Sequence, residues 1–167
     1  FRRVLFRSVR ADALAETARL AAERAPAVRV STHLCDVSDE SAVVAFRDEV
    51  VAAHSTDHID LLFNNAGIAG GGSFLLASRE EWDRTFAIDW SGVYYCCRAF
   101  VPLLVAAPEA ALVNTSSVNG FWASLGPGTA HTAYSTAKFA VRGFTESLIG
   151  DLDRKSTRLN SSHGYIS

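Results

Sequence analysis

Two spacings of apolar residues follow one another along the first part of this chain. Residues 11–24 and 41–54 place apolar side chains at helical spacing, three or four positions apart. Residues 28–34 alternate and are rich in β-branched side chains, and residues 59–63 form a short apolar run; both patterns are typical of strands. The pattern therefore predicts helix, strand, helix and strand in turn. On the second helix we expect five side chains to face the sheet, namely Val43, Val44, Phe46, Val50 and Val51.

The second part of the chain continues with longer elements. Ser78, followed three positions later by an acidic residue, forms a capping-box pattern and predicts a helix that runs towards Pro102. The apolar run that starts at Leu112 and ends at Ser117 predicts a buried strand that emerges at a site. A further stretch with helical apolar spacing opens at Tyr134. We therefore expect the last long helix to begin close to that tyrosine.

Composition narrows the class of protein. The chain has 167 residues, of which 49% are hydrophobic, and this suits one domain with a sizeable core. The formal net charge is -2 with both signs interspersed, so neither nucleic acid nor an anionic membrane is expected as a partner. The sequence has no apolar run long enough to cross a bilayer and no charged, then apolar leader. We therefore expect a soluble cytoplasmic protein.

The spacing of cysteines and glycines gives no metal or phosphate site. Cys35, Cys96 and Cys97 form no Cys-x-x-Cys and no Cys/His ligand spacing. We interpret them as small buried side chains in a reducing compartment. The glycine triplet at 70–72 lacks the Gly-x-Gly-x-x-Gly spacing of a phosphate loop, so we interpret it as a flexible connector. No metal is expected.

Three side chains in the second part of the chain suggest acid/base chemistry. Tyr134 and Lys138 are four positions apart on a predicted helix, so they lie one turn apart on the same face. A nearby positive charge favours the ionised form of a phenol, and such a phenol can exchange protons with a reacting oxygen. Ser117, at the end of the preceding strand, would hold that oxygen by a hydrogen bond.

At these residues the sequence resembles the classical short-chain dehydrogenase/reductase family, whose signature is a Ser after the fifth strand and a Tyr-x-x-x-Lys on the following helix. The sequence Asn-Asn-Ala-Gly at residues 64–67 matches the family's turn after the fourth strand. The resemblance implies an α/β fold, here a truncated doubly wound Rossmann-type parallel sheet with strands 3 to 5 and their helices. It also implies an enzyme that uses NAD or NADP to interconvert a secondary alcohol and a ketone. In that enzyme Tyr134 would donate or accept the proton, Lys138 would favour the phenolate and hold the nicotinamide ribose, and Ser117 would polarise the carbonyl.

The resemblance further implies a cofactor site at the carboxyl ends of parallel strands, where doubly wound folds bind ligands. Asp36 and Val37 match an Asp-Val pair that lies against the adenine ring in the family. Asp36 also suits the start of a turn before a helix, and this alternative stays open. The residues that the resemblance places at the cofactor are Asp36, Val37, Asn64, Ala66, Gly67, Tyr134 and Lys138.

Asp89 departs from the family pattern. Family members usually have an Asn at the matching point, where it holds a water in a proton path to the active-site lysine. An Asp can still accept hydrogen bonds, so we expect Asp89 to keep this water site as a member of the catalytic set. The carboxylate would change the charge near Lys138.

The interval from Ser117 to Tyr134 is longer than is usual in the family. Such a loop would lie over the substrate pocket, and its apolar content leads us to expect a bulky, largely apolar alcohol or ketone as substrate. In the family the helix that starts near Ser78 packs against its copy, which implies a homodimer or homotetramer. The bulky and turn-forming residues of the loop are Phe121, Trp122, Leu125, Gly126, Pro127 and Gly128.

Both ends of the chain look foreign to the rest. Residues 1–8 and 153–167 resemble translated sequencing-adapter sequence, and the chain contains no Met. We expect these ends to be non-native and residues 9–152 to be part of a Rossmann-type domain. The resemblance starts after the family's second strand, which would leave residues 59–63 as a bare sheet edge. We expect the polypeptide to fold poorly and to be inactive by itself, with residues 4–6 pairing opportunistically with the next strand.

Two other functions stay open at this stage. An epimerase or dehydratase of the related extended branch would share Tyr-x-x-x-Lys, although the Asn-Asn-Ala-Gly turn argues against it. A cofactor-binding sensor or scaffold would share the fold, although the intact set of Ser117, Tyr134 and Lys138 argues against it. The sequence does not select the substrate, the reaction direction, or NAD over NADP.

Overall fold

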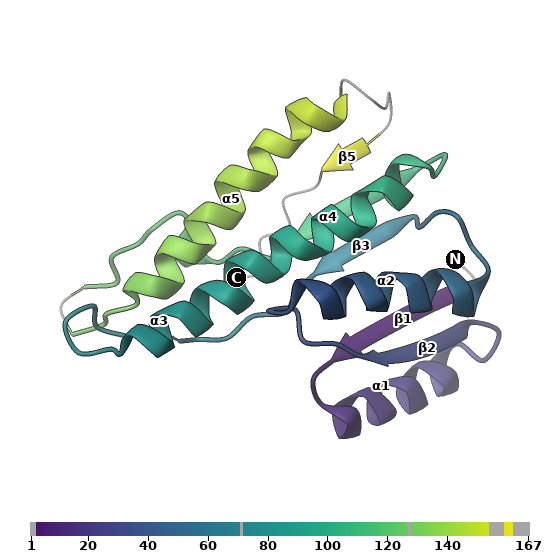
Figure 1. Cartoon of the computed structure of the whole chain (residues 1–167), viewed down its shortest axis with the longest axis horizontal. Coiled ribbons are helices and arrows are strands. Elements are labelled where there is room, and N and C mark those ends of the chain that lie inside the picture. Colours follow the sequence, from purple (N-terminus) through teal and green to yellow (C-terminus); the bar gives the residue numbers. More distant parts are fainter. Residues whose placement is uncertain (1–2, 71, 127, 154–158, 162–167) are drawn as a thin grey trace.

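The computed structural model describes residues 3–70, 72–126, 128–153 and 159–161. Helices and parallel strands alternate along these residues, which confirms the α/β class (Figure 1). Gly71 of the glycine triplet, Pro127 of the long loop and most of the last fifteen positions lie outside the described residues. Among the described helices, none is both long and apolar enough to cross a membrane.

The first sheet is a parallel pair of strands with a helix between them in sequence. Strand β1 (Arg3–Ser8) leads through helix α1 (Ala11–Arg24) to strand β2 (Arg29–Leu34). The two strands pair in register, with Val4 opposite Val30. This confirms the expected pairing of residues 4–6 with the next strand. A parallel pair needs such a crossover, and an α-helix is its usual form.

Helix α2 (Glu40–His54) begins at Asp39, whose side chain accepts hydrogen bonds from the Ser41 and Ala42 amides. The expected buried face is largely correct, since Val43 and Val50 are fully buried. Val44 is the exception, because it is 38% exposed. At 100° per residue it turns away from the stripe formed by its neighbours at helical spacing.

The second sheet carries the polar strand ends. Its strands are β3 (Leu61–Asn64), β4 (Ala110–Asn114) and β5 (Leu159–Ser161), all parallel and in the order β3-β4-β5. Strand β3 is therefore an edge among the described strands, as predicted for residues 59–63. Leu61 and Phe63 are 47% and 52% exposed there. Whether the polypeptide folds poorly by itself stays a prediction.

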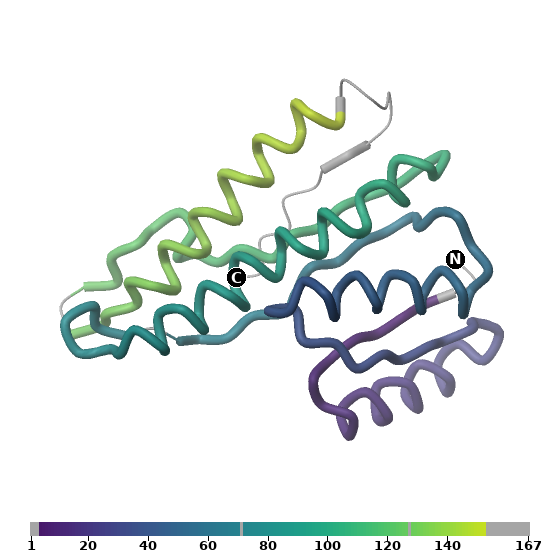
Figure 2. The backbone as a smooth tube through the Cα atoms, viewed as in Figure 1, coloured from purple at the N-terminus to yellow at the C-terminus, as the bar shows by residue number. Residues whose placement is uncertain are grey.

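A long helical arm follows β3 (Figure 2). It consists of α3 (Arg79–Phe86), the π-helical segment η1 (Ala87–Ser91) and α4 (Gly92–Val105). The Ser78 side chain accepts the Glu81 amide at 3.2 Å, so the predicted cap is confirmed. The predicted helix differs from the structure in two ways, because a π turn interrupts it and Pro102 lies inside its last turn.

The last long helix, α5 (Thr132–Asp153), runs alongside this arm (Figure 1). A 3-10 turn, η2 (Val118–Gly120), connects β4 towards it. Two apolar clusters hold these layers together, and α4 contributes to both. The fully or largely buried members of the first are Cys35, Val37, Val43, Phe46, Val50, Cys96, Ala99 and Phe100, and those of the second are Val93, Cys97, Leu104, Leu112 and Val141.

Candidate active site

The carboxyl ends of β3 and β4 are joined by a buried pair of asparagines. Asn64 and Asn114 are register partners on the two strands, and the Asn64 amide donates to the Asn114 side-chain oxygen at 2.9 Å. The same amide contacts the Cys97 sulfur of α4 at 3.3 Å. Asn64 is 3% exposed, so its polar atoms need such partners. This linkage aligns the two strand ends where the candidate residues lie.

The hydrogen bonds of this asparagine pair continue into α5. The Asn114 side-chain amide donates to the Thr145 hydroxyl at 3.0 Å, and that hydroxyl donates to the Val141 carbonyl at 2.7 Å. Burial raises the pKa of the Cys97 thiol to about 12, so the thiol stays neutral within the chain. Helix α5 is thereby fixed to the strand ends. Neither Asn114 nor Cys97 belongs to a motif, so sequence reasoning missed both of them.

Helix α5 places Tyr134 and Lys138 on one face, as their spacing predicts. The Lys138 ammonium lies 5.5 Å from the centre of the Tyr134 ring. It also donates to the Thr115 carbonyl, just after β4, at 3.3 Å. Lys138 is 4% exposed, whereas Tyr134 is half-buried. A desolvated cation thus stands beside a phenol that solvent can reach.

Asp89 is the second charged group at this point. Its carboxylate pairs with the Lys138 ammonium at 3.2 Å, and its side chain is completely buried. Both carboxylate oxygens accept from the Ile68 amide at 3.3 Å. Burial raises the pKa of the Asp89 carboxyl, and Lys138 opposes that shift. The structure therefore brings Asp89 into direct contact with the lysine.

Gly67 makes this contact possible. A Cβ at that position would lie 2.7 Å from an Asp89 carboxylate oxygen and 3.4 Å from the Lys138 ammonium. The turn after β3 can pass over the ion pair only because this residue has no side chain. The Asn-Asn-Ala-Gly turn and the lysine of α5 are therefore parts of one arrangement.

Ser117 caps the 3-10 turn rather than ending the strand. Strand β4 stops at Asn114, and the Ser117 hydroxyl accepts the Asn119 amide at 3.2 Å. The preceding Ser116 hydroxyl donates to the Lys138 carbonyl at 3.1 Å, so the turn is tied to α5. The half-buried Ser117 thus belongs to a segment anchored one turn after Tyr134.

The two residues expected at an adenine ring lie after β2, on the first sheet. The exposed Asp36 side chain accepts the Ser38 amide at 2.9 Å and the Ser38 hydroxyl at 2.7 Å. Asp36 therefore begins a turn, which is the alternative role predicted for it from the sequence. Val37 is 4% exposed and packs against Gly92 of α4. Ala66 is half-buried and packs against the first apolar cluster, of which Val37 is a member.

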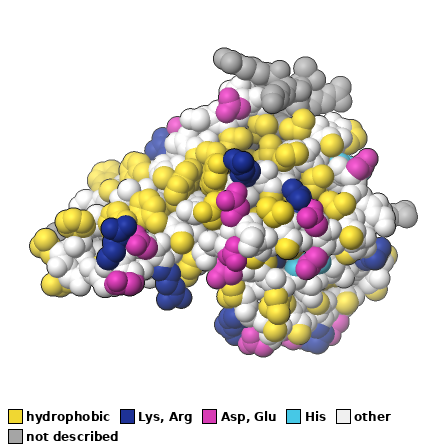
Figure 3. All heavy atoms as spheres, viewed as in Figure 1, with side chains coloured by type: hydrophobic (Ala, Val, Ile, Leu, Met, Phe, Trp, Pro, Cys, Tyr) yellow, Lys and Arg dark blue, Asp and Glu magenta, His cyan; other side chains and the backbone are white. Residues whose placement is uncertain are grey.

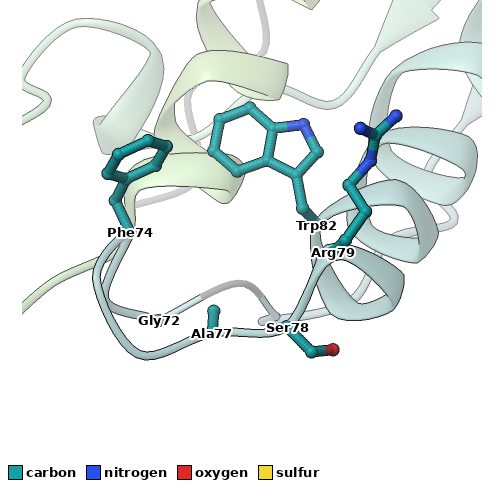
Figure 4. Close-up of a pocket in the computed structure, with 6 residues that line it drawn as sticks. All are labelled: Gly72, Phe74, Ala77, Ser78, Arg79 and Trp82. Atoms are coloured by element: carbon teal, nitrogen blue, oxygen red, sulfur yellow. The ribbon is translucent and has the colours of Figure 1, made fainter.

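A hollow lies at the β3–α3 connection and the start of α3. Its lining includes the rings of Phe74 and Trp82, which meet edge to face at 6.2 Å (Figure 4). Gly72, in the same lining, accepts the Thr132 amide of α5 at 3.4 Å. The hollow therefore adjoins the turn of α5 that carries Tyr134. Its lining residues are Gly72, Phe74, Ala77, Ser78, Arg79 and Trp82.

Metal-ligating side chains and thiols are spread over the described residues without forming a metal site. Among the described residues, no group of three or more His, Cys, Asp or Glu side chains could hold an ion. Cys35, Cys96 and Cys97 are buried as free thiols, as expected. At the strand ends lie a phenol, a hydroxyl and a buried ion pair.

Comparison with known proteins identifies the family and the fold. The family profile described as "short chain dehydrogenase" matches residues 2–165. The chain belongs to the short-chain dehydrogenase family. Among curated relatives, the chain is 40% identical over 137 residues to SadH of Mycobacterium tuberculosis, which is named as an oxidoreductase. The match covers 82% of this chain and 47% of SadH. The chain is also 33% identical over 145 residues to momilactone A synthase of Oryza sativa subsp. japonica. That match covers 86% of this chain and 50% of the synthase.

Solved structures agree. A short-chain dehydrogenase/reductase from Burkholderia phymatum in complex with NAD superimposes with a TM-score of 0.83 at 31% identity, covering 96% of this chain and 55% of that one. A metagenomic short-chain oxidoreductase in complex with NADP gives a TM-score of 0.82 at 29% identity, covering 96% and 69%. The chain spans about half the length of the curated relatives it matches.

Proposed function

We propose that the full-length protein interconverts a secondary alcohol and a ketone with NAD or NADP as hydride carrier. The observation that supports this most directly is the buried Lys138 ammonium 5.5 Å from the centre of the Tyr134 ring. A cation held beside a phenol favours proton exchange by that phenol. Family membership and the oxidoreductase names of relatives support the same reaction class.

The chain's own residues would handle the oxygen and its proton. The Tyr134 hydroxyl would donate a proton to the ketone oxygen in reduction and accept it from the alcohol in oxidation. The Ser117 hydroxyl would hold the same oxygen by a hydrogen bond and polarise the carbonyl. Lys138 would stabilise the phenolate form of Tyr134 during the transfer. When bound, the nicotinamide supplies or accepts the hydride.

The residues present fit the nicotinamide end of such a cofactor. The turn at residues 64–67 follows a parallel strand, and an ammonium lies 3.4 Å from the point where a Gly67 side chain would begin. A bare backbone turn with a nearby cation suits a ribose that carries hydroxyl groups. Asn64, Ala66, Gly67, Tyr134 and Lys138 would line this end. Asp36 and Val37 would lie towards the adenine.

We propose a bulky, largely apolar substrate. The hollow beside the start of α5 is walled by Phe74 and Trp82, and the loop after Ser117 exposes Trp122 at 69% and Leu125 at 44%. Apolar walls with few polar groups favour apolar ligands. Preference for polar sugars over hydrophobic alcohols in a substrate panel would contradict this proposal.

A homodimer or homotetramer is proposed for the full-length protein. Trp90 and Tyr94 of the arm meet Phe144 of α5 at ring distances of 5.4 and 6.2 Å, and Tyr94 is 36% exposed. Hydrophobic side chains are dense over this arm and α5 (Figure 3). Light scattering that finds a monomer at micromolar concentration would contradict it.

The experiment is a cofactor-consumption assay of the full-length protein with a panel of ketones and NADH or NADPH. Tyr134→Phe should lower kcat by about 100-fold or more, since general acid catalysis contributes about 10²–10⁴-fold. Tyr94→Phe is the matched control, because it removes a phenol hydroxyl whose partner is the exposed Arg98. Equal rates in the two variants would contradict the role of Tyr134.

Two alternatives give different outcomes in the same assay. A cofactor-binding sensor or scaffold would bind the dinucleotide without consuming it with any ketone. An epimerase or dehydratase of the extended branch would convert substrate with no net change in the dinucleotide. Consumption of the reduced cofactor with one or more ketones therefore favours the proposed oxidoreductase over both.

A further inference from the structure

The Asp89–Lys138 pair is unusual in its burial and in the number of elements that meet there. Asp89 comes from the π-helical segment η1, Lys138 from α5, and the Ile68 amide from the turn after β3. The two charged side chains are 0% and 5% exposed. A pair shielded from water in this way interacts more strongly than a surface pair.

The groups that face this pair within the described residues can be named element by element. Helix α5 contributes Lys138 and Tyr134, with the His131 ring 6.4 Å from the Tyr134 ring. The segment after β4 contributes the Thr115 carbonyl, and the turn after β3 contributes the Ile68 amide. Asp89 is therefore the anionic side chain that faces the lysine in the described part of the chain.

We propose that Asp89 is a positioning residue that acts through Lys138. Its carboxylate offsets the positive charge of the Lys138 ammonium beside Tyr134. Alcohol oxidation therefore requires a higher pH than it would with an uncharged residue at position 89. This inference rests on the proposed function of Tyr134 as the proton acceptor. A cation beside the phenol favours the phenolate, and an anion that contacts the cation cancels part of that effect.

The geometry distinguishes this from an ordinary structural salt bridge. Lys138 has two fixed acceptors, the Asp89 carboxylate at 3.2 Å and the Thr115 carbonyl at 3.3 Å. Both contacts hold the ammonium while the centre of the Tyr134 ring lies 5.5 Å away. The π turn brings Asp89 to this point, and π turns in helices are frequent at functional sites. Charge and position of the lysine are thus set together.

The test compares Asp89→Asn with Asp83→Asn in the full-length protein. Both substitutions remove one negative charge from the same helical arm, but Asp83 pairs with Arg79 at the surface. Asp89→Asn should move the acidic limb of the pH profile of alcohol oxidation down by about one pH unit. Asp83→Asn should leave it in place. Equal limbs for both variants would overturn the proposal.

A readout that needs no cofactor separates this inference from the proposed function. Tyrosinate formation is followed by its absorbance in a pH titration, and the Tyr134 component is the one that is lost in Tyr134→Phe. In Asp89→Asn the midpoint of this component should move to lower pH, as the acidic limb does. If the protein oxidises no alcohol and reduces no ketone, the proposed function fails while this titration still tests Asp89. If Asp89→Asn does not fold, carbon-13 NMR of the Asp89 carboxyl in the unsubstituted protein decides. A carboxylate at pH 7 supports the proposal, and a carboxylic acid overturns it.

Discussion

Gly67 gives a sharp prediction for the packing of the strand-end turn. In Gly67→Ala the new Cβ would lie 2.7 Å from an Asp89 carboxylate oxygen and 3.4 Å from the Lys138 ammonium. Carbon and oxygen atoms rarely approach closer than about 3.3 Å, so the carboxylate or the turn must move by about 0.6 Å. Asp89 is completely buried, which limits its freedom to move. Such overpacking costs about 1–3 kcal/mol.

Urea unfolding of the full-length protein measures this cost, and Gly143→Ala is the matched control. Gly143 lies within α5 with nothing within 4 Å of its added Cβ, so the change should stabilise by up to about 1 kcal/mol. Gly67→Ala should instead lower the unfolding midpoint. In the full-length protein it should also reduce kcat by about 10–100-fold, because displacement by a fraction of an ångström disturbs the lysine beside Tyr134. An unfolding midpoint for Gly67→Ala at or above the unsubstituted value would refute the reasoning.

Two further predictions concern titrating groups. Burial raises the pKa of the Cys97 thiol to about 12 and also raises the pKa values of Cys35 and Cys96, so a thiol reagent at pH 8 should label these cysteines only after denaturation; rapid labelling of the native protein would contradict this. The Ser41 hydroxyl, with the Ala42 and Ser41 amides, lowers the pKa of the Asp39 carboxyl in the folded state. Its contribution is therefore present above the unfolded pKa and lost as the pH falls through the folded one. The stability difference between the unsubstituted protein and Asp39→Ala should shrink below about pH 4, and a pH-independent difference in urea unfolding would argue against the cap.

Local signals predicted the elements well because they act within a few residues. Helix α1 covers residues 11–24 as expected, and the Ser78 cap is formed. Each depends on spacing or on a hydrogen bond to a residue three positions away. Val44 and Ser117 show the limit of such signals. Val44 follows the buried Val43, and the rotation of about 100° from one helical residue to the next turns it out of the buried stripe. Strand β4 ends three residues before Ser117.

The contacts across the site had no local signal. The spacing of Tyr134 and Lys138 predicted their shared face, because both lie on one helix. The Asp89–Lys138 contact joins residues far apart in sequence, and the π turn that aims Asp89 has no composition signature in its five residues. The asparagine pair that aligns β3 with β4 is likewise set by strand register. Such contacts arise only when the sheet and the helical arm are assembled.

The buried ion pair is better explained by chemistry than by stability. Moving two charges out of water costs several kcal/mol for each ion, and their attraction often does no more than offset this. Apolar side chains of similar volume would fill the same space at similar or lower free energy. Removing one partner, however, leaves the other charge buried and unpaired, which costs about 3–5 kcal/mol of stability. Lys138 therefore depends on Asp89 for its burial, and a buried ammonium beside Tyr134 is what the proposed proton transfer at that phenol would require. The pair stabilises an arrangement of charges around the phenol, and the pH profile of Asp89→Asn measures that arrangement directly.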